Sequence, residues 1–361
     1  MIAKGLEQAG FQAETFTSGR EFERAVAAES PDLCIMDLAL PDMDGVAILN
    51  ELAQQGFRGR ILLISGHSQQ VLRSVSRMAE DYQLQIIGCI RKPFTMKPLL
   101  DALKAHPSRI FVPAPRDIVD AIRNEQIIVR YQPIVDLPDH QAVAAEALVR
   151  WQHPTEGLLP PSCFLGRLDH AGMNELTAYV LRNVFQSRSL LKRSGIDVAL
   201  SVNVPTPVLL DPLFFAEVGR LMDRHQMGLE GIIIEITESD MMPDPAMLAR
   251  VLSALCLKGA RVAIDDFGTG LSSLSRLQRL PVDEVKIDKS FIRHCVTHSE
   301  DRKIVEAVIA LAHALNMRVV AEGVETDATA ALLSELGCDY AQGFLFGRPI
   351  SPASLAGLIP H

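Results

Sequence analysis

From Arg261 to Gly270 the sequence is Arg-Val-Ala-Ile-Asp-Asp-Phe-Gly-Thr-Gly. The apolar run of residues 262–264 predicts a short strand that is buried on both faces. The run stops at two adjacent carboxylates, Asp265 and Asp266, which repel each other at a buried strand end unless a cation neutralises them. Such oxygen-rich sites suit Mg²⁺ or Mn²⁺. The alternative is a capped turn, in which Asp266 solvates the start of the helix expected over Leu271–Leu280.

The same strand-then-helix pattern repeats from Asp117 to His361, a span of about 245 residues, which is the size of one (β/α)₈ barrel. Seven successive strand-like segments of this region each lead to a polar residue. These residues are Glu146, Asn203, Glu235, Asp265 with Asp266, Lys286, Glu322 and Gln342. Because the C-terminal strand ends of such a barrel form one rim, where catalysis takes place, we expect these side chains to meet.

The chemistry of this expected rim is that of a metal site. Its carboxylates would repel one another strongly without cations, and together with the two amides they suffice for one or two hard divalent ions. Lys286 can bind or orient a water molecule or a phosphate oxygen, and Glu322 can bind a metal or take a proton from that water. Taken singly, each residue has an ordinary interpretation, such as a salt-bridged Glu or a solvated Lys. The set at consecutive strand ends favours a catalytic site.

The segment from Met1 to about Ala105 shows a second alternating pattern. Strands are expected over Phe11–Thr17, Asp32–Met36, Arg60–Ile64 and Gln85–Ile90, and helices over Ile2–Gly10, Gly19–Ala28, Val46–Gln55, Val71–Ala79 and Met96–Ala105. The last three strands lead to Asp37, Ser65 and Lys92. Because parallel strand ends share one sheet edge, this carboxylate, hydroxyl and ammonium could accept, hold and neutralise a phosphoryl group. Three ordinary strand-end turns are the alternative.

Four motifs of this segment resemble the response-regulator receiver domain, which has a flavodoxin-like fold. They are Met36-Asp37-Leu38, Leu40-Pro41-Asp42-Met43-Asp44-Gly45, Ile64-Ser65-Gly66 and Lys92-Pro93-Phe94. The resemblance implies that Asp37 is the phosphoacceptor, that Ser65 and Lys92 are the sensing pair, and that a sensor histidine kinase is a partner. Two features depart from the family. Its first strand, whose acidic pair binds Mg²⁺, would precede Ile2 and is absent, and Cys89 stands where an aromatic switch residue is expected.

Between the two patterns, residues 106–116 contain Pro107, Pro113 and Pro115 and are expected to form a linker. The predicted organisation is therefore a receiver-like domain over residues 1–105 that is truncated at its N-terminus, the linker, and a barrel over residues 117–361.

The motifs of the predicted barrel resemble the EAL domain, the cyclic di-GMP phosphodiesterase family. The signature itself is Glu146-Ala147-Leu148. The other matching motifs span nearly the whole region: Tyr131-Gln132-Pro133-Ile134, Glu146 to Trp151, Val202-Asn203, Glu235-Ile236-Thr237-Glu238, Asp265 to Gly270, Val285 to Asp288, Glu322 to Glu325, and Gln342-Gly343-Phe344 with Pro349. The resemblance implies a TIM-like barrel and metal-dependent hydrolysis of cyclic di-GMP to linear pGpG.

The resemblance also implies a role for each rim residue. Those that correspond to ligands of a first metal are Glu146, Asn203, Glu235 and Asp265. Asp265 would bridge to a second metal, shared with Asp266 and Glu322. Lys286 and Glu322 would be catalytic, and Lys286 would hold the attacking water. The implied cofactors are two ions of Mg²⁺ or Mn²⁺ per barrel.

Further residues would contact the substrate or steady a loop. Arg150 would contact a substrate phosphate, which its guanidinium fork suits. The residues expected along the dinucleotide are Gln132, Leu148, Gln342 and Pro349, and the loop-stabilising residues are Glu238, for the loop after Asp266, and Glu325. Pro205 is a small departure, because the family often has Ser there. The resemblance also implies a homodimer through the barrel, with the loop Phe267–Ser273 linking the metal pair to the partner surface.

Composition limits the partners and the compartment. The formal net charge of −9 argues against nonspecific nucleic-acid binding. The six cysteines are scattered without a CxxC pair, which is typical of reduced thiols in a cytoplasmic protein. The N-terminus has no signal-peptide pattern, and no apolar run approaches the length of a membrane span.

Three functions compete for this sequence. The first is an active phosphodiesterase, and the second is a non-catalytic cyclic di-GMP receptor that uses the same pocket. The third, from bare chemistry, is an enolase-type barrel with acidic ligands and a lysine base. The acidic residue at the second strand and the doubled Asp265-Asp266 argue against the third, and no ligand position is lost, which favours the first.

We expect acetyl phosphate to label Asp37 of this 361-residue chain only weakly. Phosphoryl transfer needs Mg²⁺ between the acceptor and the incoming group, and the missing strand would supply the other ligands, since Asp42 and Asp44 lie on a turn. Either the true start lies upstream or the domain is a degenerate docking module, and the retained Asp37, Ser65 and Lys92 favour an upstream start. A protein extended upstream should therefore label at Asp37. Strong labelling of the 361-residue chain that is lost in Asp37→Ala would contradict this expectation.

Overall fold

The computed structural model describes residues 2–3, 6, 13–16, 18–28, 31–38, 45–55, 57, 59–66, 75, 82, 84–92, 94, 96–105, 113–238, 245–268, 277–355 and 357. The chain divides into two compact units, Met1–Phe111 and Val112–His361, and each is described by itself. Most of the expected linker lies outside the described residues, and the predicted domain boundaries stay a prediction.

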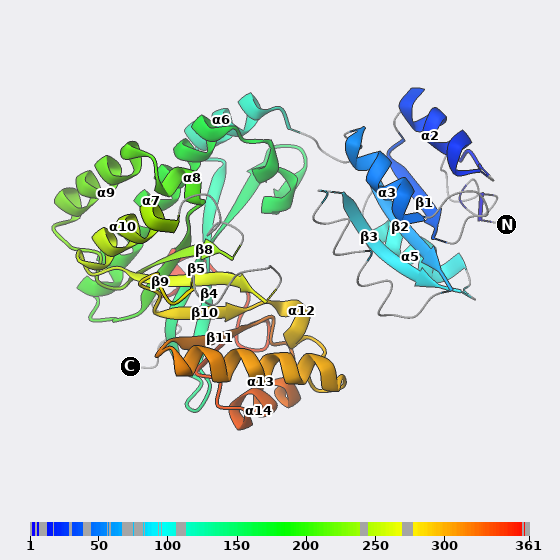
Figure 1. The fold of residues 1–361 in the computed structure, drawn as a ribbon. Coiled ribbons are helices and arrows are strands. Elements are labelled where there is room, and N and C mark those ends of the chain that lie inside the picture. Colours follow the sequence, from blue (N-terminus) through cyan, green and yellow to red (C-terminus); the bar gives the residue numbers. More distant parts are fainter. Residues whose placement is uncertain are drawn as a thin grey trace. The chain divides into compact units, whose positions relative to one another are not determined.

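The first unit contains a parallel three-stranded sheet with helices (Figure 1). Its described elements are α2 Gly19–Ala28, β1 Leu33–Asp37, α3 Gly45–Gln54, β2 Arg60–Ser65, β3 Gln85–Arg91 and α5 Met96–Ala105. The strand order is β1-β2-β3, and every residue of β2 is buried, as expected for a central parallel strand between helices. Leu49 and Leu52 of α3 form a core with Ile61 and Leu63 of β2.

This order is that of strands three to five in a flavodoxin-like sheet, whose full order is 2-1-3-4-5. The strand expected over Phe11–Thr17 is wrong where it can be checked, because residues 13–16 form no strand. The physical reason is pairing. The second strand of a flavodoxin-like sheet pairs only with the first, and the described residues contain no strand that could pair with it. Most of the helices expected over Ile2–Gly10 and Val71–Ala79 lies outside the described residues.

The second unit is a closed eight-stranded barrel with one additional strand. Its strands are β4 Ile127–Asp136, β5 Ala142–His153, β6 Gly157–Leu159, β7 Ala199–Asn203, β8 Ile232–Thr237, β9 Arg261–Phe267, β10 Glu284–Ile287, β11 Arg318–Glu322 and β12 Tyr340–Gln342. The order is β4-β12-β11-β10-β9-β8-β7-β5, and the ring closes because β4 also pairs with β5. Strand β6 extends the sheet beyond β5.

Helices surround this barrel (Figure 1). The described ones are α6 Pro115–Arg123, α7 His170–Arg193, α8 Thr206–Leu209, α9 Pro212–His225, α10 Pro245–Cys256, α12 Lys289–Ile292, α13 Ser299–Ala314, α14 Asp327–Glu335 and α15 Pro352–Leu355. Two long helices begin at side-chain caps, because Asp169 accepts a hydrogen bond from the Gly172 amide and Asp211 accepts one from the Leu213 amide. Among the helices described, none combines the length and apolar character that a membrane crossing requires.

The barrel departs from a regular (β/α)₈ pattern at its first strand. Strand β4 runs antiparallel to both of its neighbours, β5 and β12. The physical reason is the connection. Only residues 137–141 separate β4 from β5, and a parallel return would need a crossover of a dozen or more residues. The first two strands therefore form a hairpin, and the parallel pattern begins with β5 and β7.

Prolines mark two local features of the second unit. Helix α6 begins at Pro115, two residues before the expected start of the barrel region, because proline fits the first helical position and the Asp117 carboxylate accepts a hydrogen bond from the Ala114 amide at 3.0 Å. The segment that follows Pro160 forms two 3₁₀ turns, η1 Pro161–Cys163 and η2 Leu165–Arg167. Short 3₁₀ turns are the usual form for a connector of this length.

Gly343 lies where the loop that follows β12 comes closest to the loop that follows β11. A Cβ atom at this position would lie 2.0 Å from the Val324 carbonyl oxygen and 2.4 Å from the Val324 nitrogen. That backbone is held on both sides, because the Val324 amide donates to the Gln342 carbonyl at 3.0 Å and the Leu345 amide donates to the Val324 carbonyl at 3.1 Å. Only glycine permits so close an approach of the two chains.

We therefore expect Gly343→Ala to destabilise the barrel by about 1–3 kcal/mol, the usual cost of overpacking. Trp151 is the chain's one tryptophan and is buried in the barrel, so its fluorescence during urea unfolding reports on this unit. The matched control is Gly219→Ala in α9, where an added Cβ meets no atom within 4 Å. It should stabilise the protein by about 0.5–1 kcal/mol. Equal unfolding midpoints for the two variants would contradict the assigned contact.

Candidate active site

Polar side chains meet inside the barrel toward the C-terminal ends of its parallel strands. The strand register places them side by side in pairs: Gln132 with Glu146, Asn203 with Glu235, and Glu322 with Gln342. The structure therefore brings together the rim set that the sequence predicts. Glu146 does not end its strand as expected. It lies within β5, because parallel pairing with β7 stops one residue later at Ala147 while β5 continues as a hairpin with β4 and β6.

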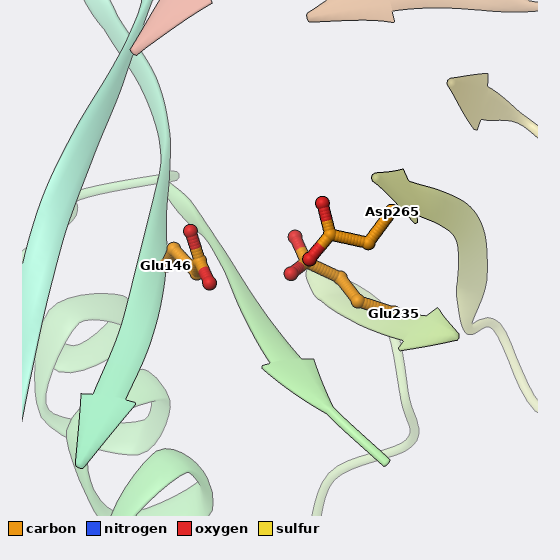
Figure 2. A group of neighbouring side chains, drawn as sticks. All are labelled: Glu146, Glu235 and Asp265. Atoms are coloured by element: carbon orange, nitrogen blue, oxygen red, sulfur yellow. The ribbon is translucent and has the colours of Figure 1, made fainter. Parts of the chain in front are cut away.

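The ammonium of Lys286 is the centre of this set. Its Nζ atom lies 2.7 Å from Glu322 Oε1, 3.0 Å from Glu235 Oε2, 3.2 Å from Glu146 Oε2 and 3.4 Å from Asp265 Oδ1. The side chain of Lys286 is 1% exposed, so these carboxylates rather than bulk solvent surround the ammonium. Figure 2 shows Glu146 on β5 facing Glu235 on β8 and Asp265 on β9.

Burial and mutual repulsion dominate the electrostatics of these groups. Burial by itself lowers the pKa of Lys286, but four carboxylates, led by Glu146 and Glu235, hold it well above its usual range. Burial raises the pKa of Glu322 to about 8, even though Lys286 opposes the shift. Burial also raises the pKa of Glu235 well above its ordinary value. The single ammonium therefore does not fully compensate the carboxylates, and additional positive charge would stabilise them.

Two groups of carboxylates have the spacing of cation sites. One group is Glu146, Glu235 and Asp265, and the other is Asp265, Asp266 and Glu322; within each, one oxygen per residue lies within 4.8 Å of the others. Asp265 belongs to both groups. Carboxylate oxygens are the ligands that Mg²⁺ and Mn²⁺ prefer, so the donor set fits a pair of hard divalent ions.

A β-bulge lets both aspartates of the quoted stretch reach the site. Val285 pairs with Ile264 and Ile287 pairs with Phe267, so that Asp265 and Asp266 together lie opposite the single residue Lys286. Adjacent residues of a regular strand point to opposite faces. Asp266 escapes this alternation because its φ is 53°, in the left-handed region, and a bulge of this kind redirects a side chain.

Burial and the neighbouring Asp265 and Asp288 raise the pKa of Asp266 to about 6. Asp288 is a neighbour of the site to which no role is predicted from sequence, and its place two residues after Lys286 is the signal that points to it. The structure adds that Asp288 is the N-cap of α12.

A chain of amides connects Glu146 to the loop after β12. Asn203 Nδ2 donates to Glu146 Oε1 at 2.9 Å, and Gln342 Nε2 donates to Glu146 Oε2 at 2.8 Å. Gln342 Nε2 also contacts Gln132 Oε1 at 3.3 Å, and Gln132 Nε2 donates to the Gly347 carbonyl at 3.1 Å. Gln132 and Gln342 are therefore buried and bonded to each other, in a position to orient Glu146.

The other expected substrate residues lie on or beside the β4–β5 hairpin. Leu148 and Arg150 follow Glu146 at intervals of two along β5, which places all three on one face. Pro349 precedes Ile350, which pairs with Tyr131 of β4.

The two glutamates that are expected to stabilise loops differ in their contacts and exposure. The Glu238 carboxylate accepts a hydrogen bond from the Gly268 amide at 2.8 Å and so contacts the segment after Asp266. Glu325 is exposed, and it lies 4.0 Å from Arg293.

The first unit holds its own group of polar side chains at the strand ends. The Lys92 ammonium forms an ion pair with the Asp37 carboxylate, and the Lys92 amide donates to the Ser65 carbonyl at 2.9 Å. The Ser65 side chain is buried. The structure therefore brings together the three residues predicted there, whereas Asp42 and Asp44 lie outside the described residues.

The comparisons with known proteins agree with both motif sets. A family model for the EAL domain matches residues 116–349, and one for the response regulator receiver domain matches residues 1–104. The cyclic di-GMP phosphodiesterase RocR of Pseudomonas aeruginosa is 32% identical over 331 residues, which cover 88% of this chain and 84% of RocR.

A second relative is known in sequence and in structure. MucR of Pseudomonas aeruginosa, a bifunctional diguanylate cyclase/cyclic di-GMP phosphodiesterase, is 39% identical over 248 residues, which cover 66% of this chain and 35% of MucR. The structure of the PaMucR phosphodiesterase in complex with cyclic di-GMP matches with a TM-score of 0.63 and 38% identity, covering 66% of this chain and 98% of that one. The chain therefore belongs to the EAL-domain family and carries a response-regulator receiver domain ahead of its EAL barrel.

Proposed function

We propose that this protein is a metal-dependent phosphodiesterase that hydrolyses cyclic di-GMP to linear pGpG under the control of its receiver domain. The observation that carries the proposal is the pair of carboxylate groups that share Asp265 around the buried Lys286. The names of RocR and of the solved PaMucR complex supply the substrate class. A cyclic dinucleotide is a phosphodiester, which two-metal sites of this kind cleave.

Two divalent cations, Mg²⁺ or Mn²⁺, complete the proposed site. Glu146, Asn203, Glu235 and Asp265 hold the first, and Asp265, Asp266 and Glu322 hold the second. When bound, these ions supply Lewis-acid stabilisation of the charge that develops on the phosphoryl oxygens. The bulge at Asp266 serves this arrangement, because it gives the second group its third carboxylate.

The remaining residues position the reactants. The Lys286 ammonium lies 2.7 Å from the Glu322 carboxylate, so the attacking water can be held by Lys286 and can give its proton to Glu322. Water forms the new bond to phosphorus while the bond to the ribose 3′ oxygen breaks. The leaving 3′ oxygen takes up the proton that Glu322 accepted from the water, and the product is the linear dinucleotide. Arg150 binds a substrate phosphate, and Glu238 holds the segment after Asp266 through the Gly268 amide.

The receiver domain supplies the proposed regulation. Asp37 accepts a phosphoryl group from a sensor histidine kinase, and Ser65 and Lys92 sense it. The ion pair between Lys92 and Asp37 supports this proposal, because phosphorylation of Asp37 would replace the carboxylate that Lys92 contacts. A homodimer through the barrel is also part of the proposal, although only Phe267 and Gly268 of the loop Phe267–Ser273 lie among the described residues.

We expect the purified protein to convert cyclic di-GMP to pGpG only with a divalent metal, because attack on phosphorus needs the Lewis-acid stabilisation that the ions supply. Chromatography of the products should show pGpG with Mg²⁺ or Mn²⁺, none after treatment with EDTA, and recovery when metal is restored. A protein with full metal occupancy that binds cyclic di-GMP without forming pGpG would instead be a receptor.

We expect Lys286→Ala and Glu322→Ala each to lower kcat/KM by about 10³-fold or more, because they remove the groups that hold and deprotonate the water. Cyclic di-GMP binding should largely survive in Lys286→Ala, which separates loss of chemistry from loss of the site. Lys303→Ala on the exposed side of α13 is the matched control and should keep wild-type kinetics. Circular dichroism should show an intact fold in all three variants. Wild-type turnover by Lys286→Ala would refute the assigned mechanism.

A further inference from the structure

The β4–β5 hairpin has one face that is turned away from the helices. Tyr131 of β4 is fully buried, and its hydroxyl lies 3.0 Å from Ser187 on α7. Because side chains alternate along a strand, Arg130 and Gln132 point to the opposite face. Gln132 pairs across the strands with Glu146, so this opposite face is the one that carries the site.

Two arginines lie on this face beyond Glu146. Arg130 pairs across the strands with Leu148, and Arg150 is the next residue on the same side of β5. Arg130 and Arg150 are therefore diagonal neighbours, a spacing of roughly 7–8 Å that long side chains can bridge. Both residues are half-buried.

Among the described residues, neither guanidinium forms an ion pair with a carboxylate, although the Glu146 carboxylate attracts Arg150. Arg150 donates to the carbonyl of its neighbour Val149 at 2.7 Å and forms no ion pair with any described residue. Arg130 forms no hydrogen bond or ion pair within the described part of the chain. Several other arginines of this barrel do have a carboxylate partner, as Arg123 has in Glu175 and Arg182 has in Glu217. Two unpaired arginines beside an acidic site are ready to bind an anion.

The charge balance of the site fits the anion that the proposed function supplies. The five carboxylates of the two metal groups and the ammonium of Lys286 leave a net charge of four negative, which two divalent cations would cancel. A cyclic dinucleotide adds two phosphates, one at the metals and one remote from the reacting bond. Its two negative charges equal the two positive charges of Arg130 and Arg150.

We propose that Arg130 binds the substrate together with Arg150, and that the two arginines hold the phosphate that is not cleaved. This proposal rests on the proposed function, because it takes cyclic di-GMP as the ligand. Arg130 lies outside the residues to which the family resemblance gives a role, and its position on the hairpin is the basis of the assignment. The antiparallel hairpin thereby contributes substrate binding, while the parallel strands contribute the metals.

The test compares binding and turnover in Arg130→Ala. The loss of a charge-assisted hydrogen bond should raise the Kd for cyclic di-GMP about tenfold or more, measured by calorimetry on metal-free protein in EDTA, where no turnover is expected. With metal, KM should rise to a similar extent while kcat stays within about twofold, because a remote contact binds ground state and transition state alike. Arg130→Lys should recover part of the affinity, since it keeps the charge but not the fork.

Two controls make the result specific. Bis(p-nitrophenyl) phosphate has a single phosphodiester, so Arg130→Ala should hydrolyse it at the wild-type kcat/KM. Arg302→Ala on α13, which removes an arginine paired with Glu306, should bind cyclic di-GMP as the wild type does.

If Arg130→Ala binds cyclic di-GMP with the wild-type Kd, this inference alone is refuted. It is also refuted if Arg130→Ala loses kcat/KM equally on cyclic di-GMP and on bis(p-nitrophenyl) phosphate. A wild-type protein that does not bind cyclic di-GMP overturns the proposed function and this inference with it. A wild-type protein that binds without turnover refutes only the catalytic proposal, because the calorimetric comparison still applies.

Discussion

The site depends on one buried ammonium that lies among carboxylates. Lys286 is within 3.4 Å of oxygens from four acidic residues, on strands that are not all adjacent in the barrel. A buried charge costs several kcal/mol unless it is paired, and so do buried carboxylates. The buried ammonium and the buried carboxylates therefore stabilise each other inside the barrel. The remaining excess of negative charge is what makes the same position attractive to divalent cations.

The barrel combines parallel strands with one antiparallel hairpin. Its parallel strands end at one rim and bring acidic residues together there, as parallel barrels generally do. The antiparallel hairpin of β4 and β5 continues beyond that rim, because a short turn joins the two strands. One face of the hairpin carries Gln132, Glu146, Leu148 and Arg150. The amide chain from Glu146 to the Gly347 carbonyl connects the carboxylate groups to the loop after β12, so that their positions are set together.

In the receiver domain, too, parallel strand ends bring polar side chains together. Three parallel strands end side by side, and the ion pair between Lys92 and Asp37 forms at that edge. The structure differs from the sequence expectation at residues 13–16, where strand-like sequence forms no strand. A β-strand is stable only when a neighbour satisfies its backbone groups, and the preferences of its own residues cannot provide that neighbour.

The two folds and the polar residues that meet inside the barrel could be predicted from the sequence, because buried parallel strands are continuous apolar runs and each run leads to a polar residue. Helices α2 and α5 match their predicted bounds. Three features could not be predicted from the sequence, because they depend on pairing between distant strands. The antiparallel direction of β4, the place of Glu146 inside β5 and the bulge that turns Asp266 toward Asp265 all follow from strand register. A local pattern does not contain that register, because the hydrogen-bonding partner that sets it lies elsewhere in the chain.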